Sequence, residues 1–178
     1  MAVLDKLFNF FVSVQDVEEP EIIIPAPPTV YEIRPLTDKH LKEVLKLNLR
    51  CFRAGENYTK YTFNYLLSEP NCLSYRIVTP SEQMVGFVFI MTNENATGHI
   101  TTIGVAPEHR RRGLALKLLR HAEEALQKRR TSIVMLEVRV SNLAAQNLYR
   151  DLNYSIVQRL AKYYNNGEDG FLMVKSLN

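Results

Sequence analysis

Apolar and polar residues follow two different periods along this chain of 178 residues. Alternating apolar residues predict β-strands at 29–36, 74–80, 84–92, 98–106, 133–140, 154–164 and 171–177. Apolar residues spaced three and four apart predict helices at 37–53, 59–68, 114–130 and 142–152. From residue 29 onward the predicted order is β-α-α-β-β-β-α-β-α-β-β, which places the chain in the α/β class with a mixed sheet.

Local signals support the ends of several predicted elements. Thr37 or Asp38 can cap the first helix, whose expected buried face consists of Leu41, Val44, Leu45 and Leu49. Ser81–Gln83 provides a turn for the first hairpin, and NNGEDG at 165–170 provides a strong turn near the end of the chain. The last two strands are therefore expected to pair in antiparallel fashion.

The first 28 residues differ in pattern from the rest of the chain. Helical spacing of apolar residues predicts a short amphipathic helix over Leu4–Val12, and four prolines within 20–28 then favour an extended linker. A boundary near Thr29 therefore divides the chain into 1–28, a helix with a proline-rich linker, and a domain at 29–178. We expect the helix to dock on protein, because its polar face has too few cations for a membrane surface.

Composition narrows the class of protein. Hydrophobic residues make up 46% of the chain and the formal net charge is +3, which is typical of a globular protein. The basic residues concentrate in one triplet, so a nucleic-acid partner is not expected. Cys51 and Cys72 have no metal-ligand spacing, which favours reduced thiols in a cytoplasmic protein without a metal. We expect no signal peptide and no membrane span, and nothing in the sequence predicts an oligomeric state.

Three consecutive arginines, Arg110–Arg112, stand where a predicted strand gives way to a predicted helix. The first N–H groups of a helix lack internal partners, and Gly113 removes a side chain where an anion would approach the backbone. Arginine side chains can add forked hydrogen bonds to a phosphate. The pattern therefore predicts a cradle for a pyrophosphate-sized anion, with a solvated basic helix start as the alternative.

The spacing Arg110-x-x-Gly113-x-Ala115 resembles the Q/R-x-x-G-x-G/A signature of the GNAT N-acetyltransferases. The stretch LEVRVSNLAAQNLYRDLNY at 136–154 resembles the protein N-terminal (α-amine) acetyltransferases, including the ribosomal-protein-alanine and archaeal branches. Three further stretches are similar to the same group, namely GHITTIGV, GENY and the ending KYYNNGEDGFLM. The resemblance covers roughly Tyr31 to Leu177, and four separated motifs in the right order make it specific.

The resemblance implies a GNAT fold, with a mostly antiparallel sheet, a splayed central pair of parallel strands and flanking helices. It implies acetyl-CoA as co-substrate, with its pantetheine arm on Ile103, Gly104 and Val105. It implies that the pyrophosphate binds the segment Arg110, Arg111, Arg112, Gly113, Leu114, Ala115 and Leu116. Asn142 is assigned to the cofactor arm in the same way, although its position also suits a plain helix N-cap.

Three residues match the catalytic groups of the family. Glu137 is implied as general base acting through water, with a surface glutamate paired to an arginine such as Arg139 as the alternative. His99 matches a histidine that assists deprotonation in some relatives, and a structural histidine is the alternative. Tyr149 matches the tyrosine that binds the cofactor and protonates the thiolate of coenzyme A. The alternative is an aromatic side chain that only packs in the core. The N–H of Val105 is a candidate oxyanion donor.

The acceptor is implied to be a peptide N-terminus held between Glu56, Asn57 and Tyr58 on one side and Tyr163 and Tyr164 on the other. Gly55 stands where the archaeal pattern has proline, which loosens this loop. Asn153 stands where many relatives have glycine, and asparagine tolerates the left-handed conformation there.

The sequence therefore predicts a cytoplasmic, acetyl-CoA-dependent N-terminal acetyltransferase that works by direct attack. Ribosomal proteins are among the candidate acceptors, and the ribosome is a candidate partner. One alternative is a GNAT enzyme that acetylates lysine or a small amine. The other is a non-catalytic subunit that binds acetyl-CoA or a partner, which the presence of Glu137 and Tyr149 disfavours.

Overall fold

The computed structural model describes residues 22–52 and 57–177 of the chain. The predicted N-terminal helix at Leu4–Val12 therefore lies outside the described residues. Among the helices of the described ranges, none combines the length and the apolar character that a membrane-spanning helix needs.

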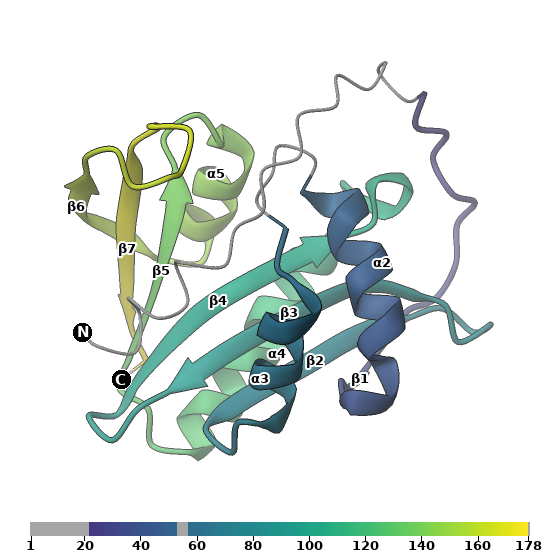
Figure 1. The fold of residues 1–178 in the computed structure, drawn as a ribbon, viewed down its shortest axis with the longest axis horizontal. Helices are drawn as coiled ribbons and strands as arrows, with labels where there is room; N and C mark the ends of the chain where they lie inside the picture. The colour runs from purple at the N-terminus through teal and green to yellow at the C-terminus, as the bar shows by residue number, and fades with distance from the viewer. Residues whose placement is uncertain (1–21, 53–56, 178) are drawn as a thin grey trace.

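Seven strands of the described chain form one sheet in the order β1-β2-β3-β4-β5-β7-β6 (Figure 1). The strands are β1 Glu32–Pro35, β2 Cys72–Val78, β3 Met84–Thr92, β4 Thr97–Val105, β5 Ile133–Arg139, β6 Ser155–Leu160 and β7 Gly170–Ser176. The pair β4–β5 is parallel and every other neighbouring pair is antiparallel. The order of elements and the sheet confirm the predicted α/β class, with a mostly antiparallel sheet and one central parallel pair.

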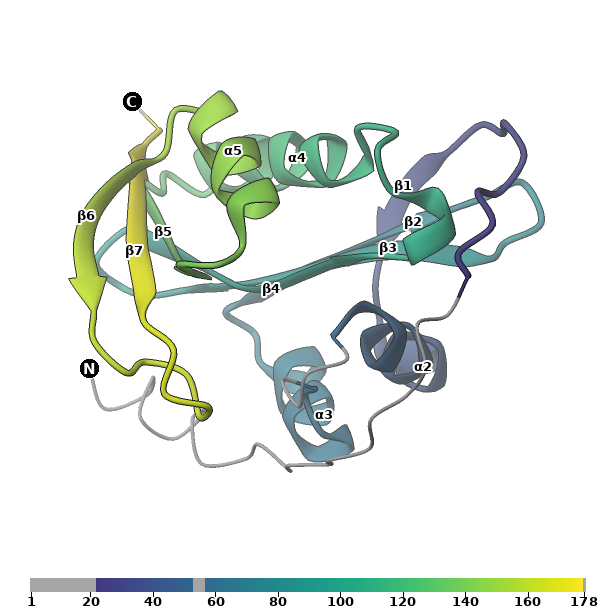
Figure 2. The same ribbon diagram turned by 90° about the horizontal axis from the view of Figure 1, so that it is seen from above.

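Helices cover both faces of the sheet. They are the 3₁₀ turn η1 Asp38–His40, α2 Leu41–Cys51, α3 Lys60–Ser68, the 3₁₀ turn η2 Pro107–His109, α4 Leu114–Lys128 and α5 Leu143–Asp151. Figure 2 shows α2 and α3 on one face and α4 and α5 on the other. The core lies between these layers, where β3 is buried over most of its length because helices pack on both of its sides.

The buried face of α2 differs from the prediction at one position. Val44 and Leu47 are buried, whereas Leu49 is 60% exposed. The polar residue Asn48 takes the buried position instead, because it stands four residues after Val44 on the same side of the helix. The other predicted members of the stripe, Leu41 and Leu45, are partly buried against the core.

Local side-chain and backbone features fix the ends of two other helices. Thr59 caps α3 by accepting a hydrogen bond from the backbone N–H of Thr62 at 3.2 Å. Asn153, after α5, has φ of 67°, which confirms that asparagine takes the left-handed conformation at this position. The chain can therefore turn from α5 directly into β6.

Candidate active site

The sheet opens where β4 and β5 part. Their parallel pairing covers only Thr97–His99 and Ile133–Met135. Beyond these residues β4 continues to Val105 and β5 to Arg139 without pairing to each other. The two strands diverge in Figure 1, so the facing backbone edges of their carboxyl-terminal halves are not paired with each other.

The backbone of β4 has unused hydrogen-bonding groups beside this opening. The N–H of Ala106 donates to the carbonyl of Val85 at 2.9 Å, and ladder bonds alternate along an antiparallel pair. Ile103 and Val105 therefore turn their N–H and C=O groups away from β3, toward the departing β5. The carbonyl of Val105 accepts from Nε of Arg110 at 3.1 Å. No described residue pairs with the N–H of Val105 or with the backbone of Ile103.

Gly104 has a different role from its two neighbours. The same alternation turns its N–H and C=O toward Phe87 of β3, so these groups belong to the sheet. A Cβ atom at Gly104 would lie 2.8 Å from the ring of Phe87 and 3.0 Å from Sγ of Cys51. Gly104 thus permits close packing, and the candidate ligand-binding groups come from Ile103 and Val105.

His99 and Glu137 meet across the start of the opening. Nε2 of His99 lies 2.6 Å from Oε2 of Glu137, and the two side chains are only 15% and 14% exposed. As predicted, strand alternation points Glu137 to one face of the sheet, while Leu136 and Val138 are buried on the other face. A carboxylate can only accept, so Nε2 of His99 donates when Glu137 is ionised.

Two of the predicted acceptor-binding tyrosines lie around this pair. Tyr58 donates its hydroxyl hydrogen bond to the carbonyl of Thr101 at 3.0 Å, at a bulge of β4. Burial, followed by the negative charge of Glu137, raises the pKa of both Tyr58 and Tyr163. Both phenols therefore stay neutral beside the carboxylate of Glu137.

Arg139 does not pair with Glu137. Its guanidinium lies 3.9 Å from the centre of the Tyr164 ring and forms an ion pair with Glu168. Hydrogen bonds from Ser141, together with Arg139, lower the pKa of Glu168 to about 2. A Cβ at Gly170 would lie 3.3 Å from the Tyr164 ring, so glycine allows the tyrosine turn to fold onto β7. These contacts fix the second wall of the candidate acceptor site.

Tyr149 approaches from the other face of the sheet. It belongs to α5, is 6% exposed, and its ring centre lies 5.8 Å from that of Tyr154. Burial raises the pKa of Tyr149, so the phenol keeps its proton well above neutral pH. Tyr149 and Glu137 are thus held on different elements and can serve two different atoms.

The predicted phosphate cradle has the backbone that an anion site requires. Arg111 and Gly113 both have positive φ, 62° and 72°, immediately before the fifteen-residue helix α4. Such a turn directs successive N–H groups to one side. Leu114 is buried and Ala115 and Leu116 are partly buried, so these residues can offer only backbone groups.

The three arginines are not equivalent. Arg110 donates to the carbonyl of Val105, and Arg112 donates to the carbonyls of Ala26 and Pro27 in the linker. Both side chains are therefore used inside the protein. The middle arginine is exposed and has no side-chain partner among the described residues. Sequence reasoning could not distinguish the three, because the bonds of Arg112 reach residues more than 80 positions away.

Asn142 caps α5. Its side chain accepts a hydrogen bond from the backbone N–H of Ala145 at 3.0 Å, as the N-cap interpretation predicts. The cap occupies the side-chain oxygen and leaves the amide nitrogen for a ligand.

Asn57, another predicted acceptor residue, lies shortly before the start of α3. Glu56 is outside the described residues. The side-chain oxygen of Asn57 accepts from Nδ2 of Asn48 at 3.1 Å, and the same nitrogen lies 3.4 Å from the carbonyl of Tyr58. Asn48 is only 1% exposed and was missed from the sequence. A polar residue on an otherwise apolar helix stripe was the available signal.

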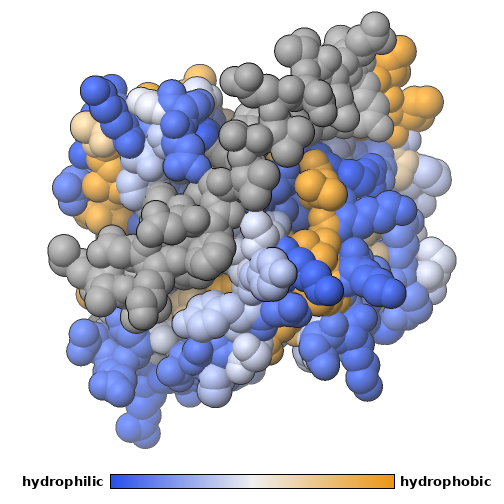
Figure 3. Space-filling model, viewed as in Figure 1, coloured by the Kyte–Doolittle hydropathy of each residue, from blue (hydrophilic) through white to orange (hydrophobic). Residues whose placement is uncertain are grey.

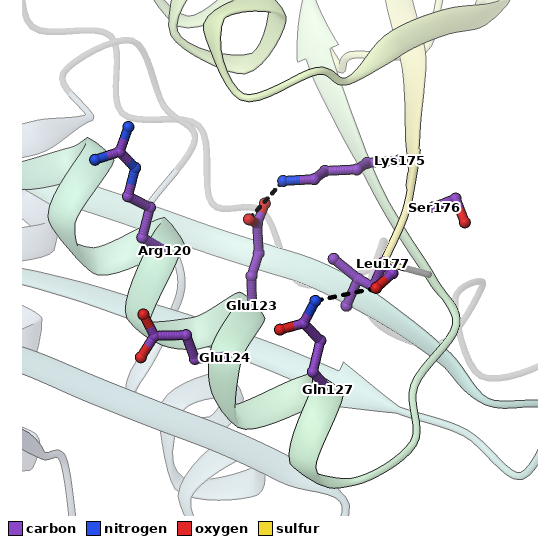
Figure 4. Close-up of a pocket in the computed structure, with 7 residues that line it drawn as sticks. All are labelled: Arg120, Glu123, Glu124, Gln127, Lys175, Ser176 and Leu177. Atoms are coloured by element: carbon purple, nitrogen blue, oxygen red, sulfur yellow. Dashed lines mark hydrogen bonds and ion pairs between the residues drawn. The ribbon is translucent and has the colours of Figure 1, made fainter.

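A separate depression of about 320 Å³ lies between α4 and β7 (Figure 4). Inside it, Nζ of Lys175 and Oε2 of Glu123 are 2.6 Å apart, and both side chains are largely buried. This ion pair fastens α4 to the last strand. The lining consists of Arg120, Glu123, Glu124, Gln127, Lys175, Ser176 and Leu177, none of which belongs to the site at the β4–β5 opening.

No cluster of three or more histidine, cysteine, aspartate or glutamate side chains in the described ranges could hold a metal ion.

Comparison with known proteins agrees with this geometry. The catalytic subunit NAA10 of the N-terminal acetyltransferase A complex of Arabidopsis thaliana is 39% identical over 151 residues, covering 82% of this chain and 77% of that protein. The N-alpha-acetyltransferase daf-31 of Caenorhabditis elegans is 38% identical, covering 77% and 78%. The crystal structure of the ribosomal-protein-S18-alanine N-acetyltransferase of Escherichia coli superposes with a TM-score of 0.77 at 25% identity, covering 84% of this chain and 95% of that one.

The Acetyltransferase (GNAT) family matches residues 41–154, a range that includes the β4–β5 opening, the arginine triplet and α5. The chain belongs to the GNAT family of acetyltransferases, which use acetyl-CoA as acetyl donor.

Proposed function

We propose that this protein transfers the acetyl group of acetyl-CoA to the N-terminal α-amine of proteins or peptides, by direct attack of the amine. The observation that carries the proposal is the His99–Glu137 pair at 2.6 Å, half-enclosed by Tyr58 and Tyr163. A carboxylate beside neutral phenols can attract an ammonium group and then take its proton. Of the two relatives near 40% identity, one is by name the catalytic subunit of an N-terminal acetyltransferase complex and the other an N-alpha-acetyltransferase, which supports the same acceptor.

The residues at the opening fit acetyl-CoA. A Cβ at Gly113 would meet no atom within 4 Å, so the space above the start of α4 is free for a phosphate. The backbone groups of Ile103 and Val105 face the gap between β4 and β5, as an extended pantetheine arm requires. Bound acetyl-CoA supplies a thioester carbonyl, which the amine attacks.

The proposal gives each residue one task. Glu137 accepts the proton of the amine directly or through one water, and His99 orients the carboxylate by donating to it. The N–H of Val105 stabilises negative charge on the carbonyl oxygen. Tyr149 provides the proton that the leaving sulfur needs, and its raised pKa keeps that proton available. Asn57, Tyr58, Tyr163 and Tyr164 hold the peptide end, together with Glu56.

Direct attack agrees with the state of the nearest thiol. Cys51 packs below Gly104, and burial raises the pKa of its thiol to about 11. A thiol with this pKa is almost entirely protonated at neutral pH and is a poor nucleophile. An acetyl-cysteine intermediate on Cys51 is therefore disfavoured.

The acceptor is tested with one peptide sequence in two forms. One form has a free N-terminus and no lysine, and the other is blocked at the N-terminus and has one internal lysine. An α-amine titrates near 7.7–8.0 and a lysine near 10.4, so deprotonating the lysine costs about 3.5 kcal/mol more. We expect acetylation of the free N-terminus to be faster in kcat/KM by at least about 10²-fold. Faster acetylation of the blocked peptide would overturn the α-amine assignment and favour the lysine alternative.

Binding of acetyl-CoA at the cradle predicts a thermal shift that depends on Gly113. Acetyl-CoA at 100 times its Kd should raise stability by about 2.7 kcal/mol, or the melting temperature by about 5–10 °C. Gly113→Asn should abolish this shift, because asparagine tolerates the positive φ of 72° but its side chain occupies the phosphate space.

Gly167→Asn is a matched control for this prediction. Gly167 also has a positive φ, of 81°, and no atom lies within 4 Å of a Cβ there, but it belongs to the turn between β6 and β7. The control should keep the full acetyl-CoA shift. Equal shifts in both variants would show that the diphosphate binds elsewhere.

We further propose that the enzyme works in the cytoplasm and that ribosomal proteins are among its acceptors. The structural likeness to a ribosomal-protein-alanine acetyltransferase supports the second point. Incubation with acetyl-CoA carrying a labelled acetyl group, followed by mass spectrometry of ribosomal-protein N-termini, tests it directly.

A further inference from the structure

The linker that precedes β1 lies against the loop that joins β4 to α4. Figure 2 shows the described linker running past this loop. We call residues Ala26–Tyr31 the strap. The backbone N–H of Ala26 donates to the carbonyl of Glu108 at 2.9 Å, and the hydroxyl of Tyr31 lies 2.9 Å from Nδ1 of His109. The strap thus contacts η2, which ends immediately before the cradle begins at Arg110.

Arg112 joins the strap to the cradle itself. Its guanidinium donates to the carbonyls of Ala26 and Pro27 and, at 2.8 Å, to the hydroxyl of Tyr31. Nζ of Lys117, one turn into α4, donates to the carbonyl of Tyr31 at 3.0 Å. All of these partners are uncharged, so the positive charge of Arg112 has no anion among them.

We propose that the strap positions the phosphate cradle through Arg112 and in this way sets the affinity for acetyl-CoA. The inference rests on the proposed binding of acetyl-CoA at this loop. Arg112 is then a positioning residue that does not touch phosphate, and Arg111 is the arginine that faces the diphosphate.

The backbone of the cradle explains why it needs such an anchor. Arg112 stands between Arg111 and Gly113, which both have positive φ. A residue other than glycine reaches this conformation at a cost of about 1–2 kcal/mol, so a free loop would leave it for part of the time. Bonds from the intervening side chain to the strap hold the N–H groups aligned before the ligand arrives. Binding then loses less conformational freedom, which is the physical basis of preorganisation.

The proposal also moves the domain boundary that the prolines suggested. Ala26 and Pro27 would belong functionally to the acetyltransferase domain, although they precede Thr29. The described linker residues before Ala26 are much more exposed to solvent, since Ile22 and Ile24 are 88% and 78% exposed. In Figure 3 an orange, apolar group lies at the upper right, where Figure 1 places this end of the linker.

Three substitutions in the full-length chain test the proposal. Arg112→Gln and Tyr31→Phe weaken the anchor from its two sides, and Arg111→Gln is the matched control from the same loop. The first measurement is hydrogen exchange of the backbone amides at 111–116 without ligand. The second is the Kd for acetyl-CoA across a tenfold range of salt concentration, because screening reveals direct contacts between charges.

We expect Arg112→Gln to speed exchange in the ligand-free loop and to raise Kd by about tenfold, as for the loss of hydrogen bonds from a charged group, with a salt slope flattened less than in Arg111→Gln. Tyr31→Phe should do the same to a smaller extent, and it carries the test if Arg112→Gln does not fold. Arg111→Gln should leave exchange unchanged, raise Kd and flatten the salt slope.

A flattened salt slope with normal exchange in Arg112→Gln would overturn the inference, because Arg112 would then contact phosphate directly. Normal exchange and normal Kd in Tyr31→Phe and Arg112→Gln would also overturn it. If the unaltered chain does not bind acetyl-CoA, the proposed function fails, and the effect of the strap on affinity fails with it. The exchange measurement is made without ligand, so it still shows whether the strap holds the loop.

Discussion

Replacing Glu137 with glutamine is expected to lower kcat for a peptide with a free N-terminus by about 10²-fold or more at pH 7, the usual effect of losing a general base. Glutamine keeps the size of the side chain and an oxygen that can accept from Nε2 of His99, 2.6 Å away in the unaltered protein. The fold and the local hydrogen bond should therefore survive, and only the capacity to take a proton is lost. Steady-state kinetics with saturating acetyl-CoA measures the effect.

The pH dependence of the Glu137→Gln variant separates a base from a structural carboxylate. An α-amine with a pKa near 7.8 becomes deprotonated as pH rises, and its neutral fraction grows about sevenfold between pH 7 and pH 9. The variant should recover by roughly that factor, because the solvent then removes the proton that Glu137 would have taken. A structural role predicts an equal loss at both pH values.

Glu124→Gln is the control for the loss of one carboxylate. Glu124 is exposed on α4 and lines the depression that is remote from the β4–β5 opening. It should keep kcat within about twofold, as for a surface substitution. If Glu137→Gln also stays within twofold, the base lies elsewhere, with Glu56 as the next carboxylate to replace.

Periodicity alone was sufficient to predict the order of elements, because each strand and helix buries one face. It could not predict where β4 and β5 part, since β5 keeps its alternating pattern beyond its last paired residue, Met135, and β4 beyond His99 is irregular because of its bulge against β3. The opening depends on the absence of pairing partners across the gap. The GNAT resemblance predicted it, and the residues themselves did not.

The catalytic pair shows the same division between local and distant information. Strand alternation predicted that Glu137 would face away from Leu136 and Val138, and the structure confirms it. The contact with His99 joins residues 38 positions apart and follows from the register of β4 against β5. Sequence reasoning also offered Arg139 as the partner of Glu137, but the structure pairs Arg139 with Glu168.

The arginine triplet marks the limit of reading charge from sequence. Three adjacent cations suggested three ligands for one anion, yet Arg110 bonds to the end of β4 and Arg112 to the strap. Which arginine stays exposed depends on carbonyl groups far along the chain. Asn48 was missed for a similar reason, because its partner Asn57 is placed by the packing of α3 against α2.

Replacing Tyr149 with phenylalanine is expected to lower kcat about 10²-fold, with no recovery as pH rises. Burial raises the pKa of Tyr149, so in the unaltered enzyme the phenol keeps its proton through pH 9 and kcat should show no loss from its ionisation there. Removing the hydroxyl removes a proton donor, and a higher pH cannot replace it. This contrasts with Glu137→Gln, whose defect shrinks under the same conditions. Tyr75→Phe, on β2 and packed against His121, is the control and should leave kcat unchanged.

The leaving group provides the strictest test of the role of Tyr149. When the carbon–sulfur bond breaks, the electron pair goes to sulfur, which then takes a proton from the Tyr149 hydroxyl. A donor whose thiol is more acidic than that of CoA needs this proton less, because its thiolate is already a stable product. The defect of Tyr149→Phe should therefore shrink with an acetyl thioester of a more acidic CoA analogue, while the defect of Glu137→Gln stays the same. An equal defect with both donors would show that Tyr149 acts through packing against Tyr154, 5.8 Å away between ring centres, and that the thiolate leaves without a proton from this residue.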